Sequence, residues 1–220
     1  MRPAPCLAGL TLILSAACSS PVESRLDAAS LEMQQGAYER AISIYEDLLV
    51  KVPDAPNLHN NMGYALLQLG RYEEALSHFE AALEGTSANT QRAALLHNWA
   101  NALEKLGDLE ASADMYSSAA DADPFRAETH VNWGNVLVRL GKLEEAVEHY
   151  RKGTDINPDN ATGWFNLGNS YERLGRLNDA LESYRQFLST GGDSPSNMTE
   201  HARRFVAQAE AAAAGEGTDL

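Results

Sequence analysis

Apolar residues recur along most of this chain at the three- and four-residue spacing of an amphipathic helix. Between residues 132 and 150 they form two runs, which Gly141 separates. The runs consist of Trp133, Leu137 and Leu140, and of Leu143, Ala146, Val147 and Tyr150. Gly141 suits the left-handed conformation in which many helices end, and Pro158 cannot continue the second helix. The pattern predicts two helices of about 13 residues each, joined by a tight turn.

This helix pair is one copy of a repeat. The phrase G-x-[YL]-x-x-[AS]-x-x-x-[YF] occurs five times, beginning at Gly36, Gly70, Gly107, Gly141 and Gly175. These glycines lie 34, 37, 34 and 34 residues apart, and three extra residues, Thr90 to Arg92, account for the longer interval. A single helix pair cannot bury its own apolar face, so successive pairs must stack on one another.

A 34-residue period with these residues resembles the tetratricopeptide repeat family. The resemblance covers about Val22 to Ser194. It implies an all-α fold, a right-handed α-solenoid of five helix pairs. The pairs are expected at 22–55, 56–89, 93–126, 127–160 and 161–194. Residues 195–214 carry one apolar stripe and are expected to form a capping helix, followed by a disordered tail at 215–220.

In this family the first helix of each pair lines a concave groove, and asparagines fill two equivalent positions of that helix here. The first position holds Asn61, Asn98, Asn132 and Asn166, and the second, three residues later, holds Asn101, Asn135 and Asn169. A spacing of three places both positions on one helical face. An amide offers one acceptor and two donors, which suits the backbone of an extended peptide. Asparagines on helices packed about 8–10 Å apart would contact roughly every third residue of an extended ligand, which rises about 3.3 Å per residue.

A second interpretation gives these asparagines a structural role, because an amide can equally bond a neighbouring helix. The two rows are also incomplete. Asp27 and Ser30 take both positions in the first repeat, and Tyr64 takes the second position in the next. The sequence leaves the choice between peptide binding and helix packing open.

Charge is unevenly distributed along the chain. The formal net charge of −14 argues against nucleic acid as a partner, since phosphate binding requires a basic face. The acids concentrate on the second helices, whereas three first helices end in Lys105, Arg139 and Arg173. We therefore expect a nearly neutral groove with a basic edge, which favours an acidic or C-terminal segment. Alternatively, these cations only stabilise the helix dipole.

The segment MRPAPCLAGLTLILSAAC is typical of a bacterial signal peptide. One early cation precedes an apolar run from about Leu7 to Leu14, which is too short to span a bilayer. The ending LSAAC resembles a lipobox, although Ser15 departs from the more usual Leu. We expect a signal peptide at 1–17 and a lipid-anchored N-terminus at 18–21, with Cys18 as the lipidated residue. Cleavage by an ordinary signal peptidase is the alternative.

The residue after the cysteine bears on localisation. Ser19 resembles the sorting signal for the outer membrane in some bacteria, which would place the solenoid in the periplasm. Inner-membrane anchoring and secretion are the alternatives. Cys6 would leave with the signal peptide, so the mature chain would retain no thiol for a disulfide or a cysteine zinc site.

No motif for catalysis or metal binding stands out. The chain has six histidines, and the pairs that share a repeat position, His59 with His130 and His78 with His149, are 71 residues apart. Two repeats separate the members of each pair, which is too far for one metal ion. Phosphate loops, nucleophile elbows and HExxH motifs are missing from the sequence. We expect no enzyme activity, no cofactor and no metal.

The sequence thus predicts a protein-binding scaffold or assembly factor of the bacterial cell envelope, anchored to a membrane by lipid. A narrower version resembles the pilotins, tetratricopeptide lipoproteins that help to assemble secretin channels of type IV pili. The alternatives are a structural subunit that docks through its convex face, an accessory or adaptor of a cell-wall hydrolase, and a secreted adaptor. The identity of the partner and the oligomeric state are left open.

Overall fold

The computed structural model describes residues 21–191 and 196–216. Over these residues the chain forms eleven α-helices and no β-strand. They are α1 (Pro21–Gln34), α2 (Tyr38–Leu49), α3 (Pro56–Gln68), α4 (Tyr72–Gly85), α5 (Asn89–Leu106), α6 (Leu109–Ala122), α7 (Ala127–Arg139), α8 (Leu143–Ile156), α9 (Ala161–Arg173), α10 (Leu177–Ser189) and α11 (Asn197–Glu216). The predicted signal peptide and Cys18 lie outside the described residues.

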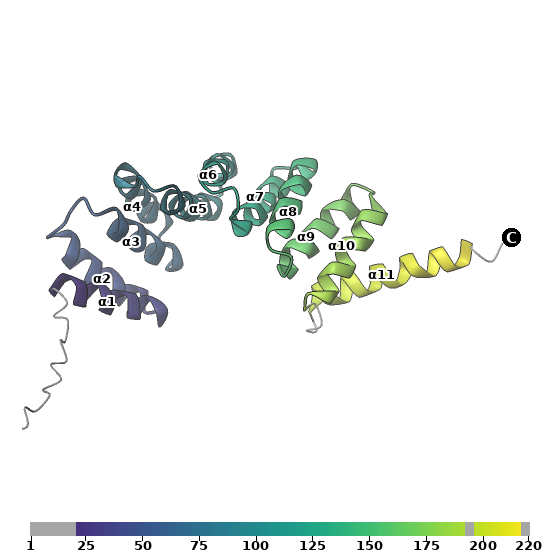
Figure 1. Ribbon diagram of the computed structural model, residues 1–220, viewed down its shortest axis with the longest axis horizontal. Helices are drawn as coiled ribbons and strands as arrows, with labels where there is room; N and C mark the ends of the chain where they lie inside the picture. Colours follow the sequence, from purple (N-terminus) through teal and green to yellow (C-terminus); the bar gives the residue numbers. More distant parts are fainter. Residues whose placement is uncertain (1–20, 192–195, 217–220) are drawn as a thin grey trace, which may run out of the picture.

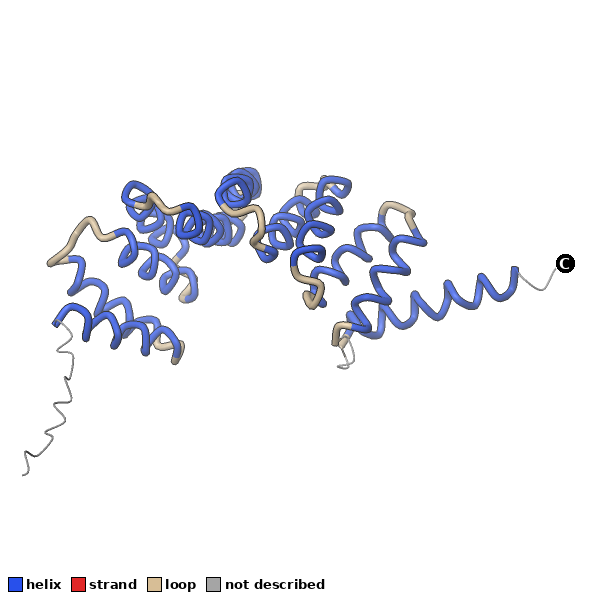
Figure 2. Tube along the Cα trace, viewed as in Figure 1, coloured by secondary structure: helices blue, strands red, loops and turns tan. Residues whose placement is uncertain are grey.

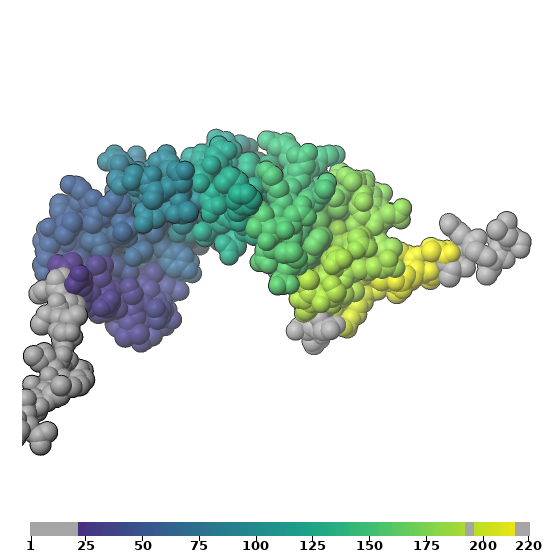
Figure 3. All heavy atoms as spheres, viewed as in Figure 1, coloured from purple at the N-terminus to yellow at the C-terminus, as the bar shows by residue number. Residues whose placement is uncertain are grey.

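Consecutive helices pair, and the pairs stack side by side into an arc (Figure 1). Each odd-numbered helix from α1 to α9 packs against the next even-numbered one, and short loops join all of them (Figure 2). The space-filling view shows the hollowed underside of this arc (Figure 3). The predicted all-α solenoid of five helix pairs with a capping helix is therefore confirmed.

Glycine makes the turn within every pair. Gly141 has a φ of 79° and Gly175 a φ of 72°, which is the left-handed region that other residues rarely adopt. The amide of Lys142, just after Gly141, donates to the carbonyl of Leu137 and closes the end of α7. The spacing of the glycines thus fixes where each first helix ends.

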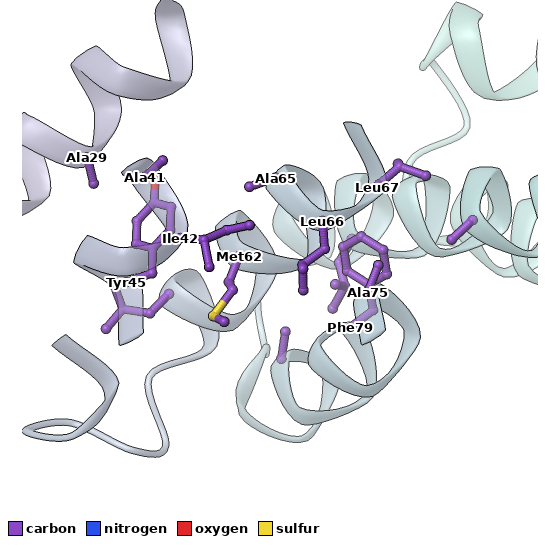
Figure 4. Packing of buried hydrophobic residues seen from close by; sticks show 14 of the residues in the cluster. Ala29, Ala41, Ile42, Tyr45, Met62, Ala65, Leu66, Leu67, Ala75 and Phe79 are labelled. Carbon is purple, nitrogen blue, oxygen red and sulfur yellow. The ribbon is translucent and has the colours of Figure 1, made fainter. Parts of the chain in front are cut away.

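The apolar core lies between successive helices. Figure 4 shows it in the first two repeats, where Ile42, Met62 and Leu66 pack between α2, α3 and α4. A second glycine allows two helices of a pair to come close. A Cβ atom on Gly134 would lie 2.6 Å from the ring of Tyr150, and one on Gly63 would lie 2.6 Å from the ring of Phe79.

The three extra residues before the third repeat lengthen a helix. The helix α5 has 18 residues, whereas α3, α7 and α9 have 13 each. Thr90 to Arg92 belong to the first turn of α5, so they do not form a loop between repeats.

The last helix closes the array. Ala202 of α11 is fully buried, and Met198, Phe205 and Val206 pack against the core formed by the last repeats. The helix ends at Glu216, two residues after the predicted end at 214, and its second half extends beyond the last repeat (Figure 1). Among the described helices, none combines the length and the apolar character that a membrane span requires.

Candidate functional site

The two rows of asparagines lie on the inner helices α3, α5, α7 and α9, where all their side chains are half-buried. They form a connected network with the tyrosines of the outer helices. At its centre, the amide oxygen of Asn135 accepts hydrogen bonds from the Tyr150 hydroxyl at 2.7 Å and from Nδ2 of Asn166 at 2.9 Å. Asn166 belongs to the next repeat, so this one oxygen links both helices of its own pair to the neighbouring pair.

The same arrangement recurs one repeat earlier. The amide oxygen of Asn101 accepts from the Tyr116 hydroxyl and, at 3.5 Å, from Nδ2 of Asn132. Asn132 also hydrogen-bonds the Tyr116 hydroxyl, and burial raises the pKa of that hydroxyl well above its usual value. Tyr116 therefore stays protonated and serves as a donor.

The network also reaches towards both ends of the array. Asn61 hydrogen-bonds the Tyr45 hydroxyl, and Asn169 hydrogen-bonds that of Tyr184. The Tyr184 hydroxyl donates to the Glu172 carboxylate at 2.8 Å, and His201 of α11 lies 2.8 Å from the same carboxylate oxygen. His201 thus occupies the place that the asparagine of a following repeat would take.

The network is interrupted in the second repeat. Phe79 stands where the other four repeats have a tyrosine, and Tyr64 replaces the second asparagine of that repeat. Asn98, which would bond a tyrosine hydroxyl of the preceding repeat, has no hydrogen-bond partner among the described residues. The sequence carries a signal for this pairing, because phenylalanine replaces tyrosine in the same repeat in which tyrosine replaces asparagine.

This network answers part of the question that the sequence left open. The oxygens of Asn101 and Asn135 are occupied within the protein, so these two amides have a structural role. Each Nδ2 group carries two hydrogens, and no interaction is found for Nδ2 of Asn101 or Asn135 within the described part of the chain. The amide row therefore offers donors to a ligand, and the acceptors that the sequence suggested at Asn101 and Asn135 are already used.

Two hollows follow the row along the concave face. One, of ≈ 480 Å³, is lined by Asn101, Lys105, Asn132 and Asn135, and by residues of the second repeat. The other, of ≈ 250 Å³, is lined by Asn135, Val138, Arg139, Asn166 and Asn169, among others. Because Asn135 lines both, the two hollows adjoin and run across the second to fifth repeats.

Of the three cations at the predicted basic edge, one is held in an ion pair with an acidic residue of the chain. Arg139 forms an ion pair with Glu104 of the preceding repeat, with 2.9 Å between Nη1 and Oε1. Lys105 and Arg173 are exposed, and neither has an ion-pair partner in the part of the chain that the structure describes. Glu104 also lines the larger hollow, so the groove alternates between acidic and basic groups at this edge.

The histidines pair within repeats. Nδ1 of His59 lies 2.9 Å from Nδ1 of His78, and Nδ1 of His130 lies 3.3 Å from Nδ1 of His149. The two histidines of each pair are 19 residues apart, one on each helix of the same repeat. Comparing equivalent positions of different repeats therefore does not reveal these contacts. In each pair the first histidine also contacts a loop carbonyl through Nε2, at Pro53 or Pro124.

The fifth repeat explains what this histidine position does. There the indole nitrogen of Trp164 donates to the carbonyl of Pro158 at 2.8 Å, as His59 and His130 contact theirs. The shared property is an N–H donor that holds the preceding loop against the inner helix. In His59 and His130 a donor at Nε2 leaves Nδ1 as an acceptor for the partner histidine.

Burial keeps several histidines neutral. It lowers the pKa of His97 to about 4, with a smaller effect from Arg126, and the pKa of His149 to about 4, with further lowering by His130 and Lys152. His97 Nδ1 lies 3.0 Å from the Thr129 hydroxyl. Within the described residues, no group of three or more histidine, cysteine or acidic side chains could hold a metal ion. The hydrogen bonds of His59, His97 and His130 link helices to one another and to the preceding loops.

Sequence profiles of one family match three stretches of the chain. A TPR repeat profile matches residues 134–175, and tetratricopeptide repeat profiles match residues 26–90 and 161–190. No curated protein matches the chain.

Several solved structures share the fold. PilF of Pseudomonas aeruginosa superposes with a TM-score of 0.72 at 17% identity, over 85% of this chain and 87% of that one. MamA of Desulfovibrio magneticus RS-1 gives 0.70 at 18% identity, over 82% and 100%. YrrB, described as a TPR protein with an unusual peptide-binding site, gives 0.66 at 23% identity, over 82% and 90%. Because the matched profiles cover more than half of the sequence and the helix pairs follow the same repeat, the chain belongs to the tetratricopeptide repeat family.

Proposed function

We propose that this protein is a non-enzymatic interaction scaffold that binds an extended segment of a partner protein in its concave groove. The observation that supports this most directly is the one-sided asparagine row. The oxygens of Asn101 and Asn135 accept from tyrosine hydroxyls and neighbouring amides, and the Nδ2 groups of these two residues are left for a ligand. The two hydrogen bonds to each of these oxygens hold the amide planes of Asn101 and Asn135 in one orientation, so their donors are positioned before the ligand arrives.

The chemistry of the groove narrows the ligand. Nδ2 groups donate, so they suit the carbonyl oxygens of an extended backbone, which recur in every ligand residue. Lys105 and Arg173 add two exposed cations at one edge. Each net hydrogen bond contributes about 1 kcal/mol, so the row alone gives modest, sequence-tolerant binding. We therefore propose that the ligand pairs its backbone with the row and places a carboxylate, either a side chain or a C-terminus, at the cationic edge.

Photocrosslinking from the two faces tests the groove. A photoreactive amino acid at Val138, which lines the smaller hollow, is expected to capture the partner in cells. The control is the same amino acid at Glu148, which is exposed on the outer helix α8. Adducts from residue 138 with none from residue 148 support groove binding. Adducts from residue 148 alone would refute it and favour docking through the convex face.

Two substitutions then separate binding from stability. Asn98→Ala removes an amide that has no partner in the described part of the chain, so it should weaken capture from residue 138 without lowering the melting temperature. Asn135→Ala removes an amide that accepts two hydrogen bonds, so it should lower both. If Asn98→Ala leaves capture unchanged, the ligand does not use this position of the row.

The envelope location belongs to the same proposal. We propose that Cys18 carries lipid and that the solenoid lies at a bacterial membrane, facing the periplasm. The sequence of residues 1–18 supports this. Palmitate labelling of the wild type, lost in Cys18→Ser, is the expected result. Continued labelling of Cys18→Ser would refute the lipid anchor but would leave the groove proposal intact.

A further inference from the structure

A third hollow, of ≈ 490 Å³, opens on the opposite, outer face, at the junction of the second and third repeats. The outer helices α4 and α6 form its walls, and the inner helix α5 forms its floor, near the top of the arc (Figure 1). Its lining is mainly apolar. Leu76, Trp99, Leu103 and Met115 contribute most of it, and all four are only half-buried.

Two of the other three junctions bury the side chains that this opening exposes, and at the junction of the third and fourth repeats the half-buried Trp133 is stacked on His149, with 3.7 Å between ring centroids. At the junction of the first two repeats, the positions of Leu76, Trp99 and Leu103 are held by Ile42, Met62 and Leu66, which are 5%, 7% and 1% exposed (Figure 4). At the junction of the last two repeats they are held by Val147, Leu167 and Tyr171, which are 4%, 2% and 6% exposed. The second junction thus leaves accessible three apolar side chains whose counterparts at the first and fourth junctions are core residues.

One small residue contributes to the opening. Ala111 lies four residues after the turn glycine of the third repeat and lines the hollow. In the other four repeats this position holds a long or charged side chain, namely Arg40, Glu74, Glu145 and Asp179. Alanine is too short to lie over the floor of the hollow, so Trp99 and Leu103 remain accessible from outside.

The rim is acidic. Glu73 and Glu80 of α4 line the hollow, and neither α4 nor α6 contains a lysine or an arginine. Glu110 and Asp114 are exposed on α6. An apolar floor beside the acidic wall of α4, with two further exposed acids on α6, favours a cationic ligand with its own apolar face.

We propose that the hollow between α4 and α6 is a docking groove for an amphipathic helix of a partner protein, one that places apolar side chains on Trp99 and Leu103 and lysines or arginines against Glu73 and Glu80. A helix about 10–12 Å across presents side chains three and four residues apart on one face, so it can place apolar residues on the floor and cations against the acidic wall of α4 at the same time. This groove is separate from the asparagine row, so the two sites can be tested independently.

The test uses the full-length chain and two labelled helical probe peptides. One carries leucines on one face and lysines elsewhere, and the other carries glutamates in place of the lysines. Fluorescence anisotropy is expected to show saturable binding of the lysine peptide only. Ala111→Glu copies the residue found in the second and fourth repeats, so it should fold normally and weaken binding by about tenfold or more. Ala111→Gln, which adds bulk without charge, should also weaken it.

Matched controls separate the groove from general attraction to an acidic protein. Ser118→Glu adds the same charge to α6 at an exposed position outside the lining, and it should change binding by less than about twofold. Glu73→Lys with Glu80→Lys should transfer the preference to the glutamate peptide, whereas Glu144→Lys with Glu148→Lys on α8 should not.

Three outcomes would overturn the proposal. The first is equal weakening by Ala111→Glu and Ser118→Glu, which would show unspecific attraction. The second is a failure of the lysine peptide to bind the wild type. The third is a wild-type dimer in sedimentation that Ala111→Glu converts to a monomer, because a second copy of the chain would then cover the groove.

Discussion

The hydroxyl of Tyr150 offers a direct test of whether the asparagine row holds the solenoid together. Tyr150 is 2% exposed, and its hydroxyl donates to the amide oxygen of Asn135 at 2.7 Å. Tyr150→Phe removes this donor and leaves the ring in place. The oxygen of Asn135 keeps its second bond, from Nδ2 of Asn166 at 2.9 Å, so it is not stranded. We expect Tyr150→Phe to lower the free energy of unfolding by about 1 kcal/mol.

Asn135→Ala should cost more, because it removes both hydrogen bonds and leaves the buried Tyr150 hydroxyl without an acceptor. The expected loss is about 2–3 kcal/mol. In the Asn135→Ala background, Tyr150→Phe should then cost nothing or restore some stability, since the stranded hydroxyl disappears. The two substitutions should therefore couple by about 1 kcal/mol or more.

Urea unfolding followed by far-ultraviolet circular dichroism measures the wild type, the two single variants and the double variant, and the slope of each transition checks that cooperativity is kept. A loss of 1 kcal/mol corresponds to about 2–4 °C in melting temperature for a chain of this size. Phe79→Tyr is a further control, because it adds a hydroxyl in the repeat whose second position lacks asparagine. If Tyr150→Phe costs the same with and without Asn135, the row does not hold the helices together.

Three further predictions concern the packing of the helices. The free energy of unfolding should fall as the pH drops from about 6.5 to 4, because buried His97 has a folded-state pKa of about 4, below its unfolded value of 6.5. In urea titrations at each pH, His97→Gln should reduce this fall by up to about 3 kcal/mol. Trp164→Phe should lower the melting temperature by removing the donor to Pro158, at about 1 kcal/mol, and Trp164→His, which copies two other repeats, should lower it less. Gly153→Ala should cost about 1–3 kcal/mol by calorimetry, because its new Cβ would lie 3.2 Å from the carbonyl oxygen of Ala127, which is backbone and cannot rotate away.

The fold could be predicted because each repeat marks its own boundaries. Gly141 and Gly175 stand where the turn requires a left-handed backbone conformation, and both have positive φ in the structure. The extra residues Thr90 to Arg92 were harder to place, because a sequence interval does not say whether an insertion lengthens a loop or a helix. They lengthen α5.

The roles of the asparagines could not be predicted from their spacing, because spacing fixes a helical face and does not fix hydrogen-bond partners. Asn101 and Asn135 bond tyrosines 15 residues away on the partner helix and asparagines 31 residues away in the next repeat. The sequence held a signal for the first contact in the coupled change at Tyr64 and Phe79. Comparing positions within a repeat, as well as between repeats, would have revealed it and also the pairing of His130 with His149.

The junction of the second and third repeats departs from the rest of the array on both faces. On the inner face Phe79 replaces the tyrosine and Asn98 has no partner in the described part of the chain, and on the outer face Ala111 leaves Trp99 and Leu103 open. In a solenoid each repeat contacts only its neighbours, so such departures cost stability locally and leave the other junctions unchanged. An array that served only as a rigid spacer would gain by repeating its best-packed junction. Two exceptions at one junction are better explained by ligands than by packing. Phe79→Tyr and Ala111→Glu restore the pattern of the other repeats at this junction. If they stabilise the chain and abolish binding, the junction gives up stability in order to bind its ligands.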